Sequence, residues 1–175
     1  MDRSIGGPDP LAIDEIQAWA DQPGLDDQEL EGIREITVAN AQDDRLDAAS
    51  RKRWAKLSLQ ANARMGAEGP WQPARQADNN HRLRALIIDR LGPDPLDPDW
   101  DPNLLASEIL GALTMTEAGA REMSAGWRRL PIEQIGYLRR IKNATAPLTQ
   151  LLRHLPPGPI HDQAREWLAV RDCLP

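Results

Sequence analysis

"LPIEQIGYLRRIKNATAPLTQLL", residues 130–152, places its aliphatic side chains three and four residues apart. This spacing is the repeat of an amphipathic α-helix, whereas a half-buried strand alternates at every second residue. Pro131 suits the first turn of one helix, and Thr145 suits the position that caps the next. We therefore expect an antiparallel pair of helices. It would pack through its aliphatic side chains, which are Ile132, Ile135, Leu138, Ile141, Leu148, Leu151 and Leu152.

A DNA-binding helix-turn-helix is the alternative for the same stretch. In that motif the small residue lies in the turn, but here Gly136 would lie inside the first helix. The first helix is also too long for the motif. The helical hairpin explains the same residues better.

The rest of the chain carries helical punctuation too. Capping residues, first-turn prolines and terminal glycines recur, and alternating β-branched runs are missing. This pattern predicts an all-α fold, a compact bundle of about seven or eight short helices joined by Pro/Gly-rich loops. The expected helices include 46–65, 79–91, 117–129 and 159–173.

Several helix starts can be predicted from single residues. Asp9 would cap a helix opened by Pro10, and a second helix would begin near Asp26 or Asp27. Thr114 and Glu117 have the spacing of a capping box. The second helix is expected to bury a face made of Leu30, Ile33, Ile36 and Thr37.

The chain of 175 residues is long enough for one well-packed domain. We expect a single helical domain over 1–175. The segment "GPDPLDPDWDP", residues 92–102, is rich in proline and aspartate and marks where a subdivision would fall, because prolines exclude regular helix there.

The same segment imitates a calcium-binding EF-hand loop. The oxygen-bearing residues at the ligand positions are Asp97, Asp99, Asp101, Asn103 and Glu108. Pro102, however, occupies the position that must turn sharply and is normally glycine. We therefore expect Asp101 to cap a helix that Pro102 opens, and we predict no metal site.

No motif for catalysis or cofactor binding was found. His154, His161 and Cys173 are ligand types for zinc, but their spacing matches no zinc motif, and His161 and Cys173 would lie about 18 Å apart along one helix. We predict no catalytic residue and no cofactor. A helical enzyme whose site is assembled without local motifs is the second alternative to the function given below.

Composition indicates a compartment. The net charge is −6, and one cysteine excludes an intrachain disulfide. The start of the sequence lacks the apolar core of a signal peptide, and no apolar run approaches the roughly 20 residues that span a bilayer. Trp occurs 6 times and Phe is absent, while Arg far outnumbers Lys, a bias typical of GC-rich genomes. We expect a cytoplasmic bacterial protein that binds no membrane.

Two tryptophans in proline-flanked loops are the candidate partner-binding residues, Trp71 in "GPWQP" and Trp100 in "PDWDP". Tryptophan in a rigid loop is a favoured interface anchor, although such a ring can also fold back onto its own protein. The sequence therefore predicts a non-catalytic protein that binds another protein or associates with itself.

Clustered basic residues support an alternative function. A phosphate-contacting face would make the chain a nucleic-acid-binding or accessory subunit. The candidate residues for that face are Lys52, Lys56, Arg128, Arg129 and Arg140. The net negative charge makes nucleic acid the less favoured partner.

Overall fold

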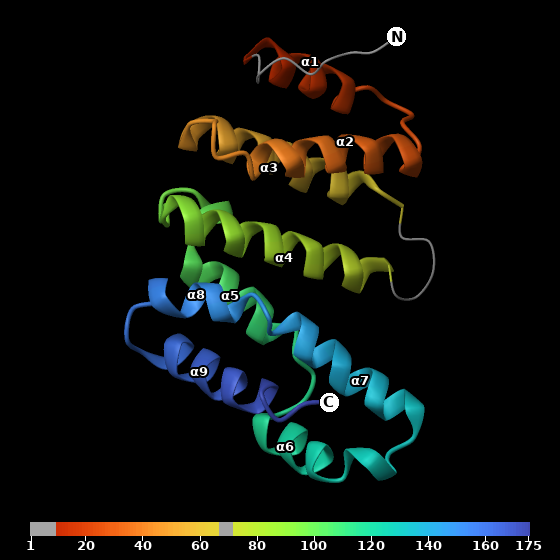
Figure 1. Ribbon diagram of the computed structural model, residues 1–175, viewed down its shortest axis with the longest axis vertical. Helices are drawn as coiled ribbons and strands as arrows, with labels where there is room; N and C mark the ends of the chain where they lie inside the picture. The colour runs from red at the N-terminus through yellow and green to blue at the C-terminus, as the bar shows by residue number, and fades with distance from the viewer. Residues whose placement is uncertain (1–9, 67–71) are drawn as a thin grey trace. The chain divides into compact units, whose positions relative to one another are not determined.

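A computed structural model describes residues 10–66 and 72–175. Over these residues the chain forms α-helices and short 3-10 helices and no strands (Figure 1). The predicted all-α fold is therefore confirmed.

The chain divides into two compact units, residues 1–80 and 81–175. The boundary falls inside helix α4 (Gln72–Leu91), and the Pro/Asp-rich segment 92–102 lies wholly within the second unit. The expected place of subdivision therefore does not coincide with this boundary.

The first unit contains α1 (Pro10–Ala20), α2 (Asp27–Ala41) and α3 (Ala48–Arg64), with α2 packed along α3 and α1 against both (Figure 1). Asp26 caps α2 in a reciprocal capping box. Its carboxylate accepts the backbone N–H of Glu29 at 2.8 Å, and the Glu29 carboxylate accepts that of Asp26 at 3.0 Å. The predicted start of this helix is confirmed.

One residue of the expected buried face of α2 was wrongly assigned. Leu30, Ile33 and Thr37 are buried, but Ile36 is 41% exposed. At about 100° per residue, Ile36 lies about 120° around the helix from Leu30, outside the stripe that faces α3.

The second unit begins with the C-terminal part of α4. It continues through η1 (Pro98–Trp100), α5 (Pro102–Gly111), α6 (Glu117–Ala125), η2 (Trp127–Arg129), α7 (Ile132–Ala144), α8 (Leu148–Leu151), η3 (Leu152–His154) and α9 (Pro159–Arg171). Helix α9 packs against α5, α6 and α8. Its fully buried Trp167 and Val170 contribute large apolar side chains to the core of this unit.

Two helix boundaries and one cap differ clearly from the sequence expectations. α4 begins at Gln72 instead of 79, and α6 ends at Ala125 instead of 129. The cap of α6 is Thr116, whose hydroxyl accepts the backbone N–H of Gly119 at 3.2 Å. Thr114 instead makes a 2.5 Å hydrogen bond with the hydroxyl of Tyr137.

The Pro/Asp-rich segment is folded by local caps. Gly92, with φ of +84°, follows the end of α4 in a conformation that favours glycine. The Asp97 carboxylate accepts the backbone N–H of Asp99, and Asp101 caps α5 by accepting the N–H of Asn103 at 2.8 Å, with Pro102 as the first residue of the helix. The predicted cap at Asp101 is confirmed.

Candidate interaction surface

The structure describes one of the two loop tryptophans. Trp71 lies outside the described residues. Trp100 is 0% exposed, and its indole N–H is buried without a hydrogen-bond partner. The ring fills the core of its own unit, which matches the alternative of self-packing, so Trp100 is not carried further as a partner contact.

The basic residues of the nucleic-acid alternative fall in different units. Lys52 and Lys56 lie on α3 in the first unit, where both are half-buried and make contacts of their own. The arginines Arg128, Arg129 and Arg140 lie in the second unit and are exposed. The three arginines are thus the larger group of these basic residues within one unit.

The connection between α6 and α7 is a hydrogen-bonded turn. Gly126 follows the end of α6, and its carbonyl accepts the backbone N–H of Arg129 at 2.9 Å. The N–H of Leu130 then bonds the Trp127 carbonyl at 3.1 Å. Pro131 fixes its own φ and precedes the first turn of α7. These bonds order the backbone of the connection.

Large apolar side chains reach solvent on this connection. Trp127 is 38% exposed, and Ile132 is 80% exposed. The prediction that Ile132 packs inside the helical hairpin is therefore wrong, although Leu138, Ile141, Leu148 and Leu151 of that hairpin are buried as expected. Ile132 is the first residue of α7, where the chain has just left the turn.

Arginines accompany these apolar groups. The Arg128 guanidinium lies 5.7 Å from the centre of the Trp127 ring, a distance at which a cation is attracted to the aromatic face. A hollow of about 520 Å³ is lined by Ala125, Gly126, Trp127, Arg128 and Arg129. We call the set Trp127, Arg128, Arg129 and Ile132 the Trp–Arg surface.

A second arginine–aromatic pair lies further along α7. The Arg140 guanidinium is 5.6 Å from the centre of the Tyr137 ring, and the Tyr137 hydroxyl is held by Thr114. Arg140 therefore adds a positive charge beside an aromatic ring whose hydroxyl is hydrogen-bonded. This pair lies on α7, the helix that follows the turn of the Trp–Arg surface.

The last residues of the chain tie down both helices that flank the connection. The Ser124 hydroxyl on α6 hydrogen-bonds the Cys173 carbonyl, and the Lys142 ammonium on α7 donates to the Leu174 carbonyl at 2.8 Å. Leu174 is buried. The turn between α6 and α7 is thus carried by two helices anchored to the same terminal segment.

Charge is distributed unevenly between the units. Residues 1–80 contain 9 basic and 15 acidic residues, whereas residues 81–175 contain 12 of each. The whole net charge of −6 therefore belongs to the first unit. The Trp–Arg surface is a basic site on a unit that is neutral overall.

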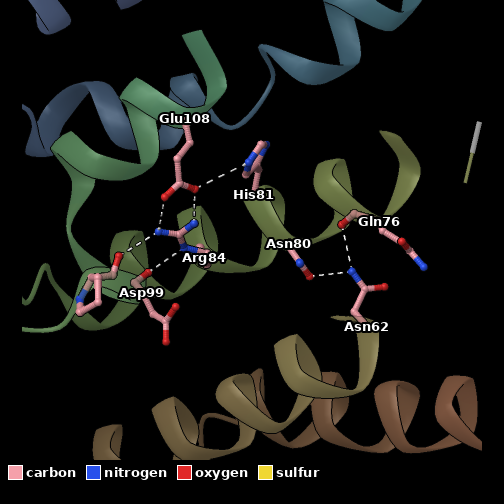
Figure 2. Close-up of polar contacts among 8 residues, drawn as sticks. Asn62, Gln76, Asn80, His81, Arg84, Asp99 and Glu108 are labelled. Carbon is pink, nitrogen blue, oxygen red and sulfur yellow. Dashed lines mark hydrogen bonds and ion pairs between the residues drawn. The ribbon is translucent and has the colours of Figure 1, made fainter. Parts of the chain in front are cut away.

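A partly buried polar cluster in the second unit is a second candidate for chemistry (Figure 2). The Arg84 guanidinium bonds the Glu108 carboxylate at 2.5 Å, and His81 Nε2 lies 3.9 Å from the same carboxylate. Burial, more than the nearby Arg84, lowers the pKa of His81, and Glu108 opposes that shift. Arg84 also binds two backbone carbonyls, so the arrangement is a clamp between α4 and the segment that leads into α5.

The histidines that were considered as metal ligands each lie beside a single carboxylate. Among the described residues, no group of three or more His, Cys, Asp or Glu side chains is arranged to hold a metal ion. His154 lies near Asp89 at 3.8 Å, and His161 pairs with its neighbour Asp162 at 3.3 Å. The structure thus leaves the Trp–Arg surface as the candidate site.

Sequence reasoning found the arginines of this surface but missed its apolar half. The expected helix 117–129 placed Trp127 within a helix, where its exposure could not be foreseen. Gly126 was the available signal, because glycine after a helical run commonly ends it. No local signal separates an exposed isoleucine at the start of a helix from a buried one.

Among the described residues, no helix combines the length and apolar character needed to cross a membrane. Comparison of the chain with models of known protein families, with curated proteins and with solved structures gives no significant match.

Proposed function

We propose that this chain is a non-catalytic interaction protein whose Trp–Arg surface docks an acidic segment of another protein. The observation that carries the proposal is the exposure of Trp127 beside two exposed arginines on one hydrogen-bonded turn, with Ile132 exposed at the start of the helix that follows. Tryptophan and arginine are the residue types most enriched among those that dominate binding energy.

The rigidity of the turn supports the proposal. A surface whose backbone is already ordered loses less conformational entropy on binding than a mobile loop does. The hollow beside Trp127 can receive one apolar side chain of the partner, while Arg128 and Arg129 attract its carboxylates. Acidic partners are therefore favoured over basic ones.

A second copy of the chain is one partner with suitable charge. Its first unit carries the net charge of −6, with exposed carboxylates at Asp26, Asp27 and Asp44. Association of the basic surface of one copy with the acidic unit of another would give the self-associating form of the same function. Light scattering after size exclusion distinguishes this form from binding to a different protein.

Nucleic acid is the alternative partner. The specific observation in its favour is the Arg128 guanidinium over a partly exposed Trp127 ring, because single-stranded nucleic acids bind to aromatic platforms flanked by positive charge. Lys52 and Lys56 belong to the other unit.

The cellular setting is part of the proposal. We place the protein in the bacterial cytoplasm. The Arg-rich composition supports a bacterial source. The single cysteine, Cys173, is exposed and fits a reducing compartment.

The test is quantitative capture from native lysate with wild-type protein, a Trp127→Ser/Ile132→Ser variant and a Leu104→Ser control. Leu104 is 41% exposed on α5 and lies outside the Trp–Arg surface. We expect a stoichiometric protein that survives nuclease, is lost with the double variant and is kept with the control. Equal capture by all three proteins would contradict the proposal.

A direct binding assay separates the two partner classes. A fluorescent single-stranded oligonucleotide and a fluorescent acidic peptide are titrated in parallel at several salt concentrations. Tighter binding of the peptide supports protein docking. Tighter binding of the oligonucleotide, with a steep salt dependence that weakens in Arg128→Glu, would assign the surface to nucleic acid.

A further inference from the structure

A groove in the second unit, separate from the Trp–Arg surface, has an unusual lining. It is open to solvent, has a volume of about 590 Å³ and is bordered by α4, the connection between α7 and α8, and α9. This volume lies within the range of about 300 to 1,000 Å³ that is typical of small-molecule sites. The charged residues of its lining are Arg82 and Arg171, and no acidic side chain lines it.

Neither arginine is neutralised. Arg82 is exposed and makes no hydrogen bond or ion pair among the described residues. The Arg171 Nε is buried without a hydrogen-bond partner, and its Nη1 lies 3.4 Å from the Thr149 hydroxyl. A buried guanidinium N–H without an acceptor is costly. Although this Nε is buried, Arg171 lines the groove together with Arg82, so an anion bound there would face both side chains.

The rest of the lining fits an organic molecule that carries the anion. Asn143, Thr149 and Gln150 offer neutral hydrogen-bonding groups, and Leu86 and Pro147 offer apolar surface. The two positive charges of the arginines match a doubly charged anion better than they match a single carboxylate. A phosphate monoester carries a charge between about −1.5 and −2 at neutral pH.

We propose that the Arg82–Arg171 groove binds the phosphate monoester of a small organic molecule. The two guanidiniums hold the phosphate oxygens, and the organic part lies along Leu86 and Pro147. This site is additional to the proposed docking function and does not depend on it.

The experiment is calorimetric titration of the full chain with phenyl phosphate at low salt, with phenol, benzoate and inorganic phosphate as comparison ligands. The variants are Arg82→Gln and a matched control, Arg165→Gln. Among the described residues Arg82 makes no hydrogen bond or ion pair that its loss would break, and Arg165 is an exposed arginine on α9 that does not line the groove. Both variants are therefore expected to fold.

We expect phenyl phosphate to bind more tightly than inorganic phosphate or benzoate, and phenol not to bind. Arg82→Gln should weaken phenyl phosphate binding about tenfold or more, as expected for loss of a charge-assisted hydrogen bond. Arg165→Gln should change the affinity less than twofold. Backbone NMR shifts on binding should concentrate at Asn143, Thr149 and Gln150.

Four outcomes would overturn the proposal. These are absence of phenyl phosphate binding at millimolar concentration, unchanged binding in Arg82→Gln, equal weakening in Arg165→Gln, and NMR shifts centred outside the groove. Tighter binding of benzoate than of phenyl phosphate would overturn the assignment of a phosphate group.

Discussion

The guanidinium of Arg84 lies 2.5 Å from the carboxylate of Glu108, joining α4 to α5 within the second unit. Arg84 is only 8% exposed, and it also donates to the backbone carbonyls of Pro98 at 2.8 Å and Asp99 at 3.0 Å (Figure 2). One buried cation thus satisfies an acidic side chain and two carbonyls of the Pro/Asp-rich segment. Apart from the single turn of η1, the segment has no helical hydrogen bonds of its own, and the bonds from Arg84 satisfy some of its carbonyls.

Replacing Arg84 by methionine should lower the free energy of unfolding by about 3 kcal/mol, because two backbone carbonyls and one carboxylate lose a charged donor. Urea denaturation followed by circular dichroism measures the change. Arg82→Met, on the exposed side of the same helix, is the control and should stay within about 0.5 kcal/mol of wild type. Similar losses in both variants would show that the clamp contributes no stability.

His81 should make the second unit less stable in mild acid. Burial lowers its pKa in the folded state below the ordinary value of 6.5. Above about pH 6.5 the imidazole is neutral in both states, and as pH falls below that value the unfolded state binds the proton first. The free energy of unfolding should therefore decrease from pH 6.5 downward until the pKa of the folded state is passed.

A comparison of wild type with His81→Asn isolates this contribution, because His154 and His161 are present in both proteins. Denaturation curves at intervals between pH 5 and pH 7.5 should show a shallower decline for the variant, in keeping with the loss of one linked proton. Parallel curves for the two proteins would assign the acid sensitivity to other groups.

Asn62 is a buried polar side chain in the first unit, and replacing it should destabilise the fold. Its amide donates to the Gln76 carbonyl at 2.9 Å and to the Asn80 side chain at 2.7 Å (Figure 2). Asn62→Leu would leave both acceptors unpaired and should reduce the free energy of unfolding by about 1 to 3 kcal/mol. Gln60→Leu, an exposed position on the same helix, is the matched control for urea denaturation. If the Asn62 variant were as stable as wild type, the Gln76 carbonyl and the Asn80 side chain would be hydrogen-bonded to water in place of Asn62.

Local rules predicted much of the fold because a cap depends on a few neighbouring residues. The start of α2 near Asp26, Asp101 with Pro102, and Pro159 in the first turn of α9 are all placed as the sequence indicated. Hydrophobic spacing likewise located most buried positions of α7. It failed at Ile36 and Ile132, because burial depends on which face a neighbouring helix covers.

The candidate sites were less accessible to sequence reasoning. The Trp–Arg surface depends on a helix that ends at Gly126, before the arginines begin. Arg82 and Arg171 lie far apart in the sequence, and they share a groove only because α4 and α9 border the same connection. No spacing rule connects two such residues. Sites of this kind follow from tertiary packing, whereas caps and helix stripes follow from local chemistry.

The Pro/Asp-rich segment holds one fully buried and one almost fully exposed large apolar residue. Trp100 is 0% exposed, whereas Leu96, in the same segment, is 96% exposed. Trp100→Ala would empty a large core volume and should lower the free energy of unfolding by about 3 to 5 kcal/mol, while Leu96→Ala should change it by less than about 0.5 kcal/mol. Urea denaturation of both variants measures this difference. If both tolerated the change, the Trp100 ring would contribute little to the core. A Trp100 variant that kept its stability but lost a bound partner would restore Trp100 as an interface residue.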